Sequence, residues 1–458
     1  MNENIARYKP LIYLIKCALN GTKPETSALA DADFDELERL GAFHSVSAMA
    51  GCALMTADAE GLMSEATLTK WRNCCHSSLR RMMLLKHETD RVCAALTDSG
   101  IRCARLKGIV VSRLFPKPMM REMTDVDILI DNSKMKQARA VMERLGYEPE
   151  AVELSNHDVY VKPPIFCFEI HEELFSRYHE KLFSCFIDCR DRMLPCESLP
   201  DELRFSDDDL FLYQMAHICK HLHDSGIGLR ALTDIYVCSG KLKTDREYID
   251  RGLEKMGIAG DAAVLSRLAE KLFSDPEDPE PMPLTGEEEN VLCFLLDSGA
   301  NGTLEQSIKN RMPQSIYTGM HDIAKLRRRY IRERIWQNPE AYKKAYPFFY
   351  RHKAARPLLP VVRLGNAVLH KRDALKSELS SVRRISRKKK EIILFSHMII
   401  YGDTARIAAH AFRSLSGIQS RLDPGQAPFV FVNKNNSRGG FFSCGLIKVQ
   451  KFCFNSIK

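Results

Sequence analysis

The sequence predicts an α+β protein in which a mixed sheet with helices is flanked by mostly helical regions. Residues 1–83 carry apolar residues at helical spacing, 84–200 alternate between helical and strand patterns, and 201–273 are helical again. With 458 residues, 45% hydrophobic and 28% charged, the chain has a globular composition and is long enough for about two or three domains.

The alternating region supplies the expected sheet. In chain order it predicts a helix ending at Gly100, a strand at 101–106, a turn at Lys107-Gly108, a short helix at 109–115, a strand at 125–130, a helix at 133–145 and a strand at 165–171. Ser133 is the expected N-cap of the helix that Gly146 ends.

Beyond the sheet, helices are expected at 207–223 and 229–239. The Pro-rich, acidic stretch 274–286 is the best linker candidate. A basic, mostly helical domain is expected at 287–390, and 391–458 is a tail that the sequence assigns to no domain.

Positive charge is concentrated in the C-terminal third. Residues 321–390 contain 21 Lys and Arg against 5 Asp and Glu, a net charge of +16, whereas the rest of the chain has 46 against 54, a net charge of −8. Such a region is suited to contact a polyanion such as nucleic acid or an anionic membrane, or it forms the solvated faces of basic helices.

Targeting and redox signals favour a cytoplasmic protein without a transmembrane segment. No apolar stretch approaches the ~20 residues of a membrane helix, and Glu3, Lys9 and Lys16 interrupt the apolar N-terminus, which argues against a signal peptide. The 15 cysteines form no CxxC pair, so reduced thiols are expected.

Two acidic motifs lie on the expected strands. Asp125 and Asp127 are two residues apart and therefore project from one face, and Glu169 and His171 repeat the arrangement on the later strand. Neighbouring strands would bring three carboxylates together, a cluster that can hold two Mg²⁺ ions for phosphoryl chemistry. His171 would either orient the molecule that accepts the transferred group or form a hydrogen bond with the carboxylates.

The Lys107-Gly108 turn precedes these motifs. A glycine at the start of a helix lets a phosphate approach the backbone N–H groups, and Lys107 and Arg121 add positive charge that suits a triphosphate. The combination of this turn, the DxD motif and the later ExH motif points to nucleotidyl transfer.

At these residues the chain resembles the polymerase-beta nucleotidyltransferase superfamily, and more narrowly its bacterial uncharacterised nucleotidyltransferase branch. The residues that carry the resemblance are Leu106, Lys107, Gly108, Arg121, Met123, Thr124, Asp125, Val126, Asp127, Glu169 and His171, with a weaker continuation around His217, His221, Arg230 and Asp234. The likeness spans roughly residues 30–370. Lys107-Gly108 replaces the superfamily's commoner Gly-Ser turn, and 16 residues separate it from Asp125.

The resemblance implies a polymerase-beta-like catalytic core, Mg²⁺ dependence and a nucleoside triphosphate (NTP) as substrate. It implies that Asp125, Asp127 and Glu169 bind metal and act in catalysis, while Lys107, Gly108 and Arg121 bind nucleotide. The acceptor stays open among a small molecule, a glycan precursor, an RNA and a protein. A non-catalytic nucleotide-binding protein, or a nucleic-acid-binding protein acting through 321–390, is the alternative.

Two further spacings favour structural roles. His217 and His221 share one helix face, a spacing that also suits zinc, but a hydrogen-bonded pair at an interface is the favoured interpretation. Arg230 and Asp234 have the spacing of an ordinary helical ion pair.

Overall fold

A computed structural model describes residues 3–57, 61–153, 155–177, 179–196, 202–300, 332 and 346–363. The chain divides into two compact units, Met1–Asn310 and Arg311–Lys458. In the second unit the described elements are the helix α17 (Pro347–Arg351) and the 3-10 helix η6 (Lys353–Leu358). The expected basic domain and the tail therefore lie mostly outside the described residues.

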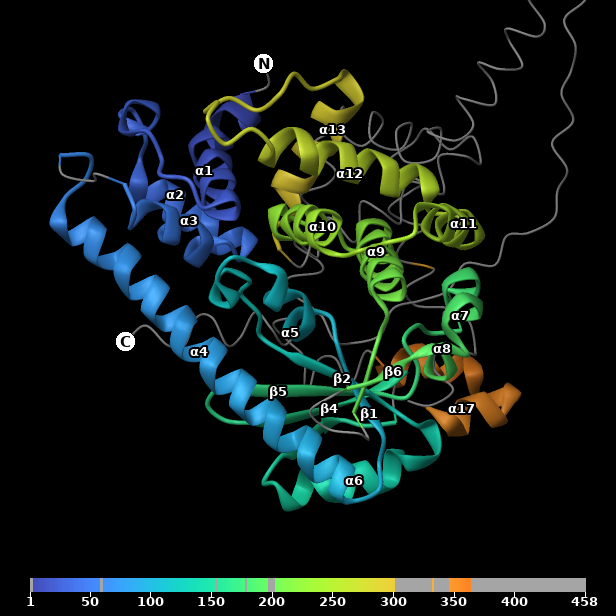
Figure 1. Ribbon diagram of the computed structural model, residues 1–458. Helices are drawn as coiled ribbons and strands as arrows, with labels where there is room; N and C mark the ends of the chain where they lie inside the picture. Colours follow the sequence, from blue (N-terminus) through green and yellow to red (C-terminus); the bar gives the residue numbers. More distant parts are fainter. Residues whose placement is uncertain are drawn as a thin grey trace, which may run out of the picture. The chain divides into compact units, whose positions relative to one another are not determined.

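The first unit contains a mixed sheet of seven strands in the order β3-β4-β5-β2-β1-β7-β6 (Figure 1). Their bounds are β1 Cys103–Leu106, β2 Val126–Ile130, β3 Glu148–Ala151, β4 His157–Lys162, β5 Phe166–His171, β6 Leu194–Pro195 and β7 Glu202–Arg204. The α+β class and the three strands expected at 101–106, 125–130 and 165–171 are confirmed. The parallel pairs β2–β5 and β1–β7 make the sheet mixed.

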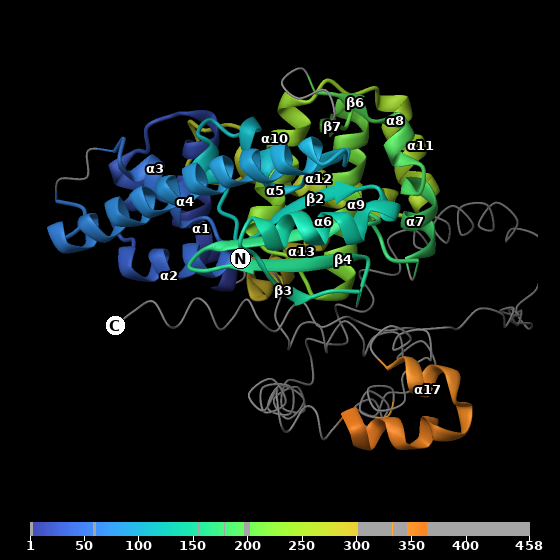
Figure 2. The same cartoon turned by 90° about the horizontal axis from the view of Figure 1, so that it is seen from below.

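The helical N-terminal region is also confirmed, as four helices: α1 Glu3–Asn20, α2 Phe34–His44, α3 Ser47–Leu54 and α4 Glu65–Asp98. Ser64 caps α4 by accepting a hydrogen bond from the Thr67 amide at 3.1 Å. This helix runs across the expected boundary at 83/84, so the N-terminal region and the sheet region share it. Together with α6 (Met135–Arg144) it covers one face of the sheet (Figures 1 and 2).

The prediction that Ser133 caps α6 is wrong. The chain enters this helix through a 3-10 turn, Asn132–Lys134, in which the Lys134 amide bonds the Asp131 carbonyl at 2.9 Å. Ser133 lies inside that turn, and no side chain caps the helix. Gly146, with φ +82°, ends the helix as expected.

The remaining helices lie between the strands or after the last one, and α9 and α10 lie on the side away from α4 and α6 (Figures 1 and 2). Their bounds are α5 Gly108–Val111, α7 Glu180–Phe186, α8 Cys189–Arg192, α9 Asp207–Asp224, α10 Leu229–Lys241, α11 Arg246–Met256, α12 Ala259–Phe273 and α13 Gly286–Ser298. The expected linker 274–286 connects α12 to α13, where the buried Lys16 ammonium donates to the carbonyls of Asp278 (2.7 Å) and Glu280 (2.9 Å). Within the described residues, no helix is long and apolar enough to cross a membrane.

Candidate functional site

Strand register brings the acidic motifs together. β2 and β5 are parallel neighbours, and their register places Asp127 opposite Glu169. Side chains at opposed positions of neighbouring strands project to the same face. Asp125 directly precedes β2, so all three predicted carboxylates meet at one place on the sheet.

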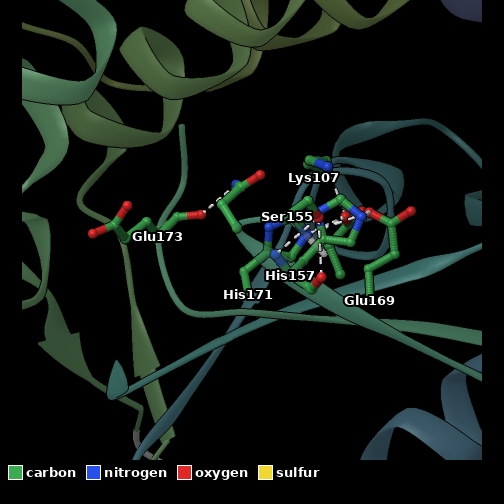
Figure 3. Close-up of polar contacts among 8 residues, drawn as sticks. Lys107, Ser155, His157, Glu169, His171 and Glu173 are labelled. Carbon is green, nitrogen blue, oxygen red and sulfur yellow. Dashed lines mark hydrogen bonds and ion pairs between the residues drawn. The ribbon is translucent and has the colours of Figure 1, made fainter. Parts of the chain in front are cut away.

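Asp127 is the centre of a polar cluster. Its Oδ1 accepts a hydrogen bond of 2.6 Å from the Lys107 ammonium and lies 2.8 Å from Nε2 of His171. Nε2 of His171 is also 3.4 Å from Oε2 of Glu169 (Figure 3). The antiparallel register of β1 and β2 explains the position of Lys107, because Leu106, its neighbour in the chain, lies opposite Asp127.

Electrostatics show an excess of negative charge at this cluster. Burial raises the pKa of Asp125 to about 6, and the nearby charges of Asp127 and Glu169 add to the effect. Burial opposes the charge on Lys107, yet the surrounding carboxylates raise its pKa above the ordinary value. The site therefore stabilises positive charge. A bound cation would favour the ionised form of Asp125 and reduce the repulsion among the three carboxylates.

His157 joins the cluster from β4, a strand that the sequence analysis did not predict. In the antiparallel register of β4 and β5, His157 lies opposite His171, and the two ring centroids are 4.8 Å apart. Its Nε2 is 3.7 Å from Oε2 of Glu169. Burial lowers the pKa of His157 to about 4, so its imidazole is neutral at neutral pH. The β-branched and aromatic run Val159-Tyr160-Val161 is the signal that would have indicated a strand here.

The donor set fits divalent cations. Three carboxylates supply the hard oxygen ligands that Mg²⁺ prefers. Within the part of the chain that the structure describes, His157, Glu169 and His171 are a group that could hold a metal ion, with one ligand atom from each within 4.8 Å of the others. The raised pKa of Asp125 adds an electrostatic reason for a cation here.

Arg121 and Gly108 are held together by packing. The Arg121 guanidinium donates two hydrogen bonds to the Asp234 carboxylate, from Nε at 3.0 Å and from Nη2 at 2.9 Å. A Cβ atom at position 108 would lie 2.5 Å from Nη1 of Arg121, so only glycine leaves room for the guanidinium. Asp234 thus pairs with a residue far away in the sequence. The expected neighbour Arg230 interacts electrostatically with Asp234 and donates from Nη1 to the Glu122 carbonyl at 3.2 Å. The contact of Arg121 and Gly108 with a nucleotide stays a prediction.

Helix α9 presents basic residues near the carboxylates. The rings of His217 and His221 are 4.4 Å apart, and burial together with the positive charges of Lys107 and Lys220 lowers both pKa values. Neither histidine belongs to the metal-ligating group found among the described residues. His223, the nearest third ligand by sequence, pairs with Asp261 at 2.7 Å, so the structure offers no support for zinc at the α9 pair.

Comparison with protein families gives one assignment. A family model described as "Uncharacterised nucleotidyltransferase" matches residues 30–274, a range that includes every site residue described above. Searches of curated proteins and of solved structures find no match. Because the matched range covers more than half of the chain, the protein belongs to this uncharacterised nucleotidyltransferase family.

Proposed function

We propose that this protein transfers a nucleoside monophosphate from an NTP to an acceptor hydroxyl and releases pyrophosphate. The observation that carries the proposal is the register of β2 and β5, which sets Glu169 beside Asp127 and close to Asp125. Three carboxylates around a buried lysine are an arrangement suited to divalent cations and phosphates. The family assignment supports the same chemistry.

The reaction is an in-line substitution at the α-phosphorus. The acceptor oxygen forms a bond to that phosphorus while the bond to the β-phosphate bridging oxygen breaks, and pyrophosphate carries away the electron pair. Glu169 takes the hydroxyl proton, because its ionised carboxylate, 22% exposed, is open to an incoming group. Two Mg²⁺ ions held by Asp125, Asp127 and Glu169 would lower the charge repulsion between nucleophile and phosphate.

Three groups would bind the nucleotide. The Lys107 ammonium lies at the cluster and would neutralise charge that develops on the phosphates. Arg121 supports the same region through its electrostatic interaction with Asp125 and Asp127, although its guanidinium is paired with Asp234. Gly108 keeps the start of α5 open enough for that guanidinium. His171 holds Asp127 and Glu169 in place or orients the acceptor.

The acceptor is proposed only as a hydroxyl-bearing molecule, whether small molecule, glycan precursor, RNA or protein. Residues 321–390 carry a net charge of +16, which favours a polyanionic acceptor. If the protein binds RNA in a salt-dependent way and Asp125→Ala leaves this binding unchanged, residues 321–390 rather than the catalytic cluster would be assigned to acceptor binding.

The test is pyrophosphate release from each of the four NTPs with Mg²⁺ and a cell extract as a source of acceptors. Asp125→Ala/Asp127→Ala is expected to abolish release. The matched control is Glu247→Ala/Asp250→Ala, which removes two exposed carboxylates from α11 and should leave release unchanged. Release that survives the first pair would contradict the proposal, and NTP binding without release would favour a non-catalytic nucleotide-binding protein.

A further inference from the structure

The group formed by His157, Glu169 and His171 has a composition that Mg²⁺-dependent phosphoryl transfer does not require. Carboxylates and water are the usual ligands of Mg²⁺, and the three predicted carboxylates already supply them. Two imidazoles beside one carboxylate are a donor set that suits Mn²⁺, Fe²⁺, Co²⁺ and Zn²⁺. The second histidine therefore needs its own explanation.

The backbone positions this group firmly. β4 and β5 pair over their whole length, from His157 opposite His171 to Lys162 opposite Phe166. Neighbouring register positions then place both imidazoles beside the Glu169 carboxylate, with nitrogen–oxygen distances of 3.7 Å and 3.4 Å. Two ligand atoms bound to one ion at about 2.1 Å each are separated by roughly 3.0–3.5 Å. The two nitrogen–oxygen distances therefore need little adjustment, and the whole group, whose ligand atoms lie within 4.8 Å of one another, would contract around the ion.

The second nitrogen of His157 is also accounted for. Its Nδ1 lies 3.4 Å from the Ser155 hydroxyl, which can accept the ring proton. Metal-binding histidines are usually oriented by a hydrogen bond at the nitrogen that faces away from the ion. Here that contact leaves Nε2 of His157 directed toward Glu169 (Figure 3).

We propose that His157, Glu169 and His171 bind a divalent transition-metal ion, with His157 as a ligand that a Mg²⁺ site would lack. Asp127, whose Oδ1 is 2.8 Å from His171, is placed to complete the coordination. This inference rests on the proposed function because it shares Glu169 and Asp127 with it. It adds a metal preference: the protein should bind Mn²⁺ more tightly than Mg²⁺.

The experiment uses the full-length, metal-free protein and MnCl₂ as the probe. Binding is followed by EPR titration, and pulsed EPR detects nitrogen coupled to the bound Mn²⁺. The wild type should show imidazole nitrogen coupling, and His157→Ala should weaken Mn²⁺ binding at least about 10-fold and reduce that coupling. His76→Ala, which removes an exposed imidazole from α4, is the matched control and should change neither.

The outcomes separate this inference from the proposed function. Mn²⁺ binding without nitrogen coupling, or with unchanged affinity in a folded His157→Ala variant, would overturn the inference even if Mg²⁺ supports pyrophosphate release. Nitrogen coupling that depends on His157, in a protein that releases no pyrophosphate, would support the metal site and reject the transfer reaction. Circular dichroism checks that each variant is folded, and His157→Gln provides a second variant if alanine disrupts the strand.

Discussion

The ion pair between Arg121 and Asp234 joins the loop before β2 to helix α10. Both side chains are buried, with 9% and 4% of their surfaces exposed. Asp234 accepts two hydrogen bonds from Arg121 and one of 3.1 Å from the amide of Gln214. Asp234→Ala would leave the guanidinium buried without this partner. Breaking a buried pair in this way costs about 3–5 kcal/mol of unfolding free energy.

Thermal unfolding of the full-length protein measures this cost. At about 2 °C per kcal/mol for a large domain, Asp234→Ala should lower the midpoint on the order of 6–10 °C. Glu247→Ala is the control, because it breaks the exposed pair with Arg251 on α11 and should cost under about 0.5 kcal/mol.

A double replacement refines the test. Arg121→Met/Asp234→Leu removes both charges, so it should cost less than Asp234→Ala alone, since no unpaired ion is left buried. An Asp234→Ala midpoint within error of the Glu247→Ala control would refute the reasoning. The Arg121–Asp234 pair would then make no measurable contribution to stability, and nucleotide binding would be the better explanation for the presence of Arg121.

Three further predictions follow from local geometry. A hydrogen bond from Arg91 lowers the pKa of Glu88 to about 2, although burial acts in the opposite direction. The stabilisation by the ionised carboxylate is therefore complete above pH 4.5 and is lost as the pH falls toward 2. In urea unfolding, Glu88→Gln should be less stable than the wild type by up to about 3 kcal/mol at pH 7, and this difference should shrink below pH 4.5. Gly108→Ala should lower the thermal midpoint through its clash with the guanidinium, whereas Gly240→Ala, with no atom within 4 Å of the new Cβ, should raise stability by about 0.5–1 kcal/mol. Thr285→Ala removes the capping box of α13 and should cost about 0.5–2 kcal/mol in the same unfolding assay. Equal pH profiles, a destabilised Gly240 variant or an unchanged Thr285 variant would each contradict its prediction.

The sequence was sufficient to predict the carboxylate cluster because the relevant signals are local. Period-two alternation identifies β2 and β5, and two-residue spacing then decides which side chains share a face. The cluster needed one further assumption, that the two strands are neighbours, and the parallel register confirms it by placing Asp127 opposite Glu169.

Contacts between distant segments could not be predicted in the same way. His157 reaches the cluster only because β4 pairs with β5 after a short connection, and its polar first residues hid the strand pattern. The partner of Arg121 lies 113 positions away on α10. Local spacing predicts only an interaction of Asp234 with Arg230 on the same helix. The contact with Arg121 depends on how α10 packs against the segment that precedes β2.

The backbone of Lys107 has an unusual conformation beside the carboxylate cluster. Its φ of +48° and ψ of −125° lie in a region that side-chain-bearing residues rarely occupy. Such strain costs about 1–3 kcal/mol and persists where the surroundings hold it. A glycine would relieve it but would lose the ammonium that bonds Asp127 at 2.6 Å. Conformation alone therefore favours glycine at this turn, and the presence of lysine indicates that the charge beside the carboxylates is worth the strain.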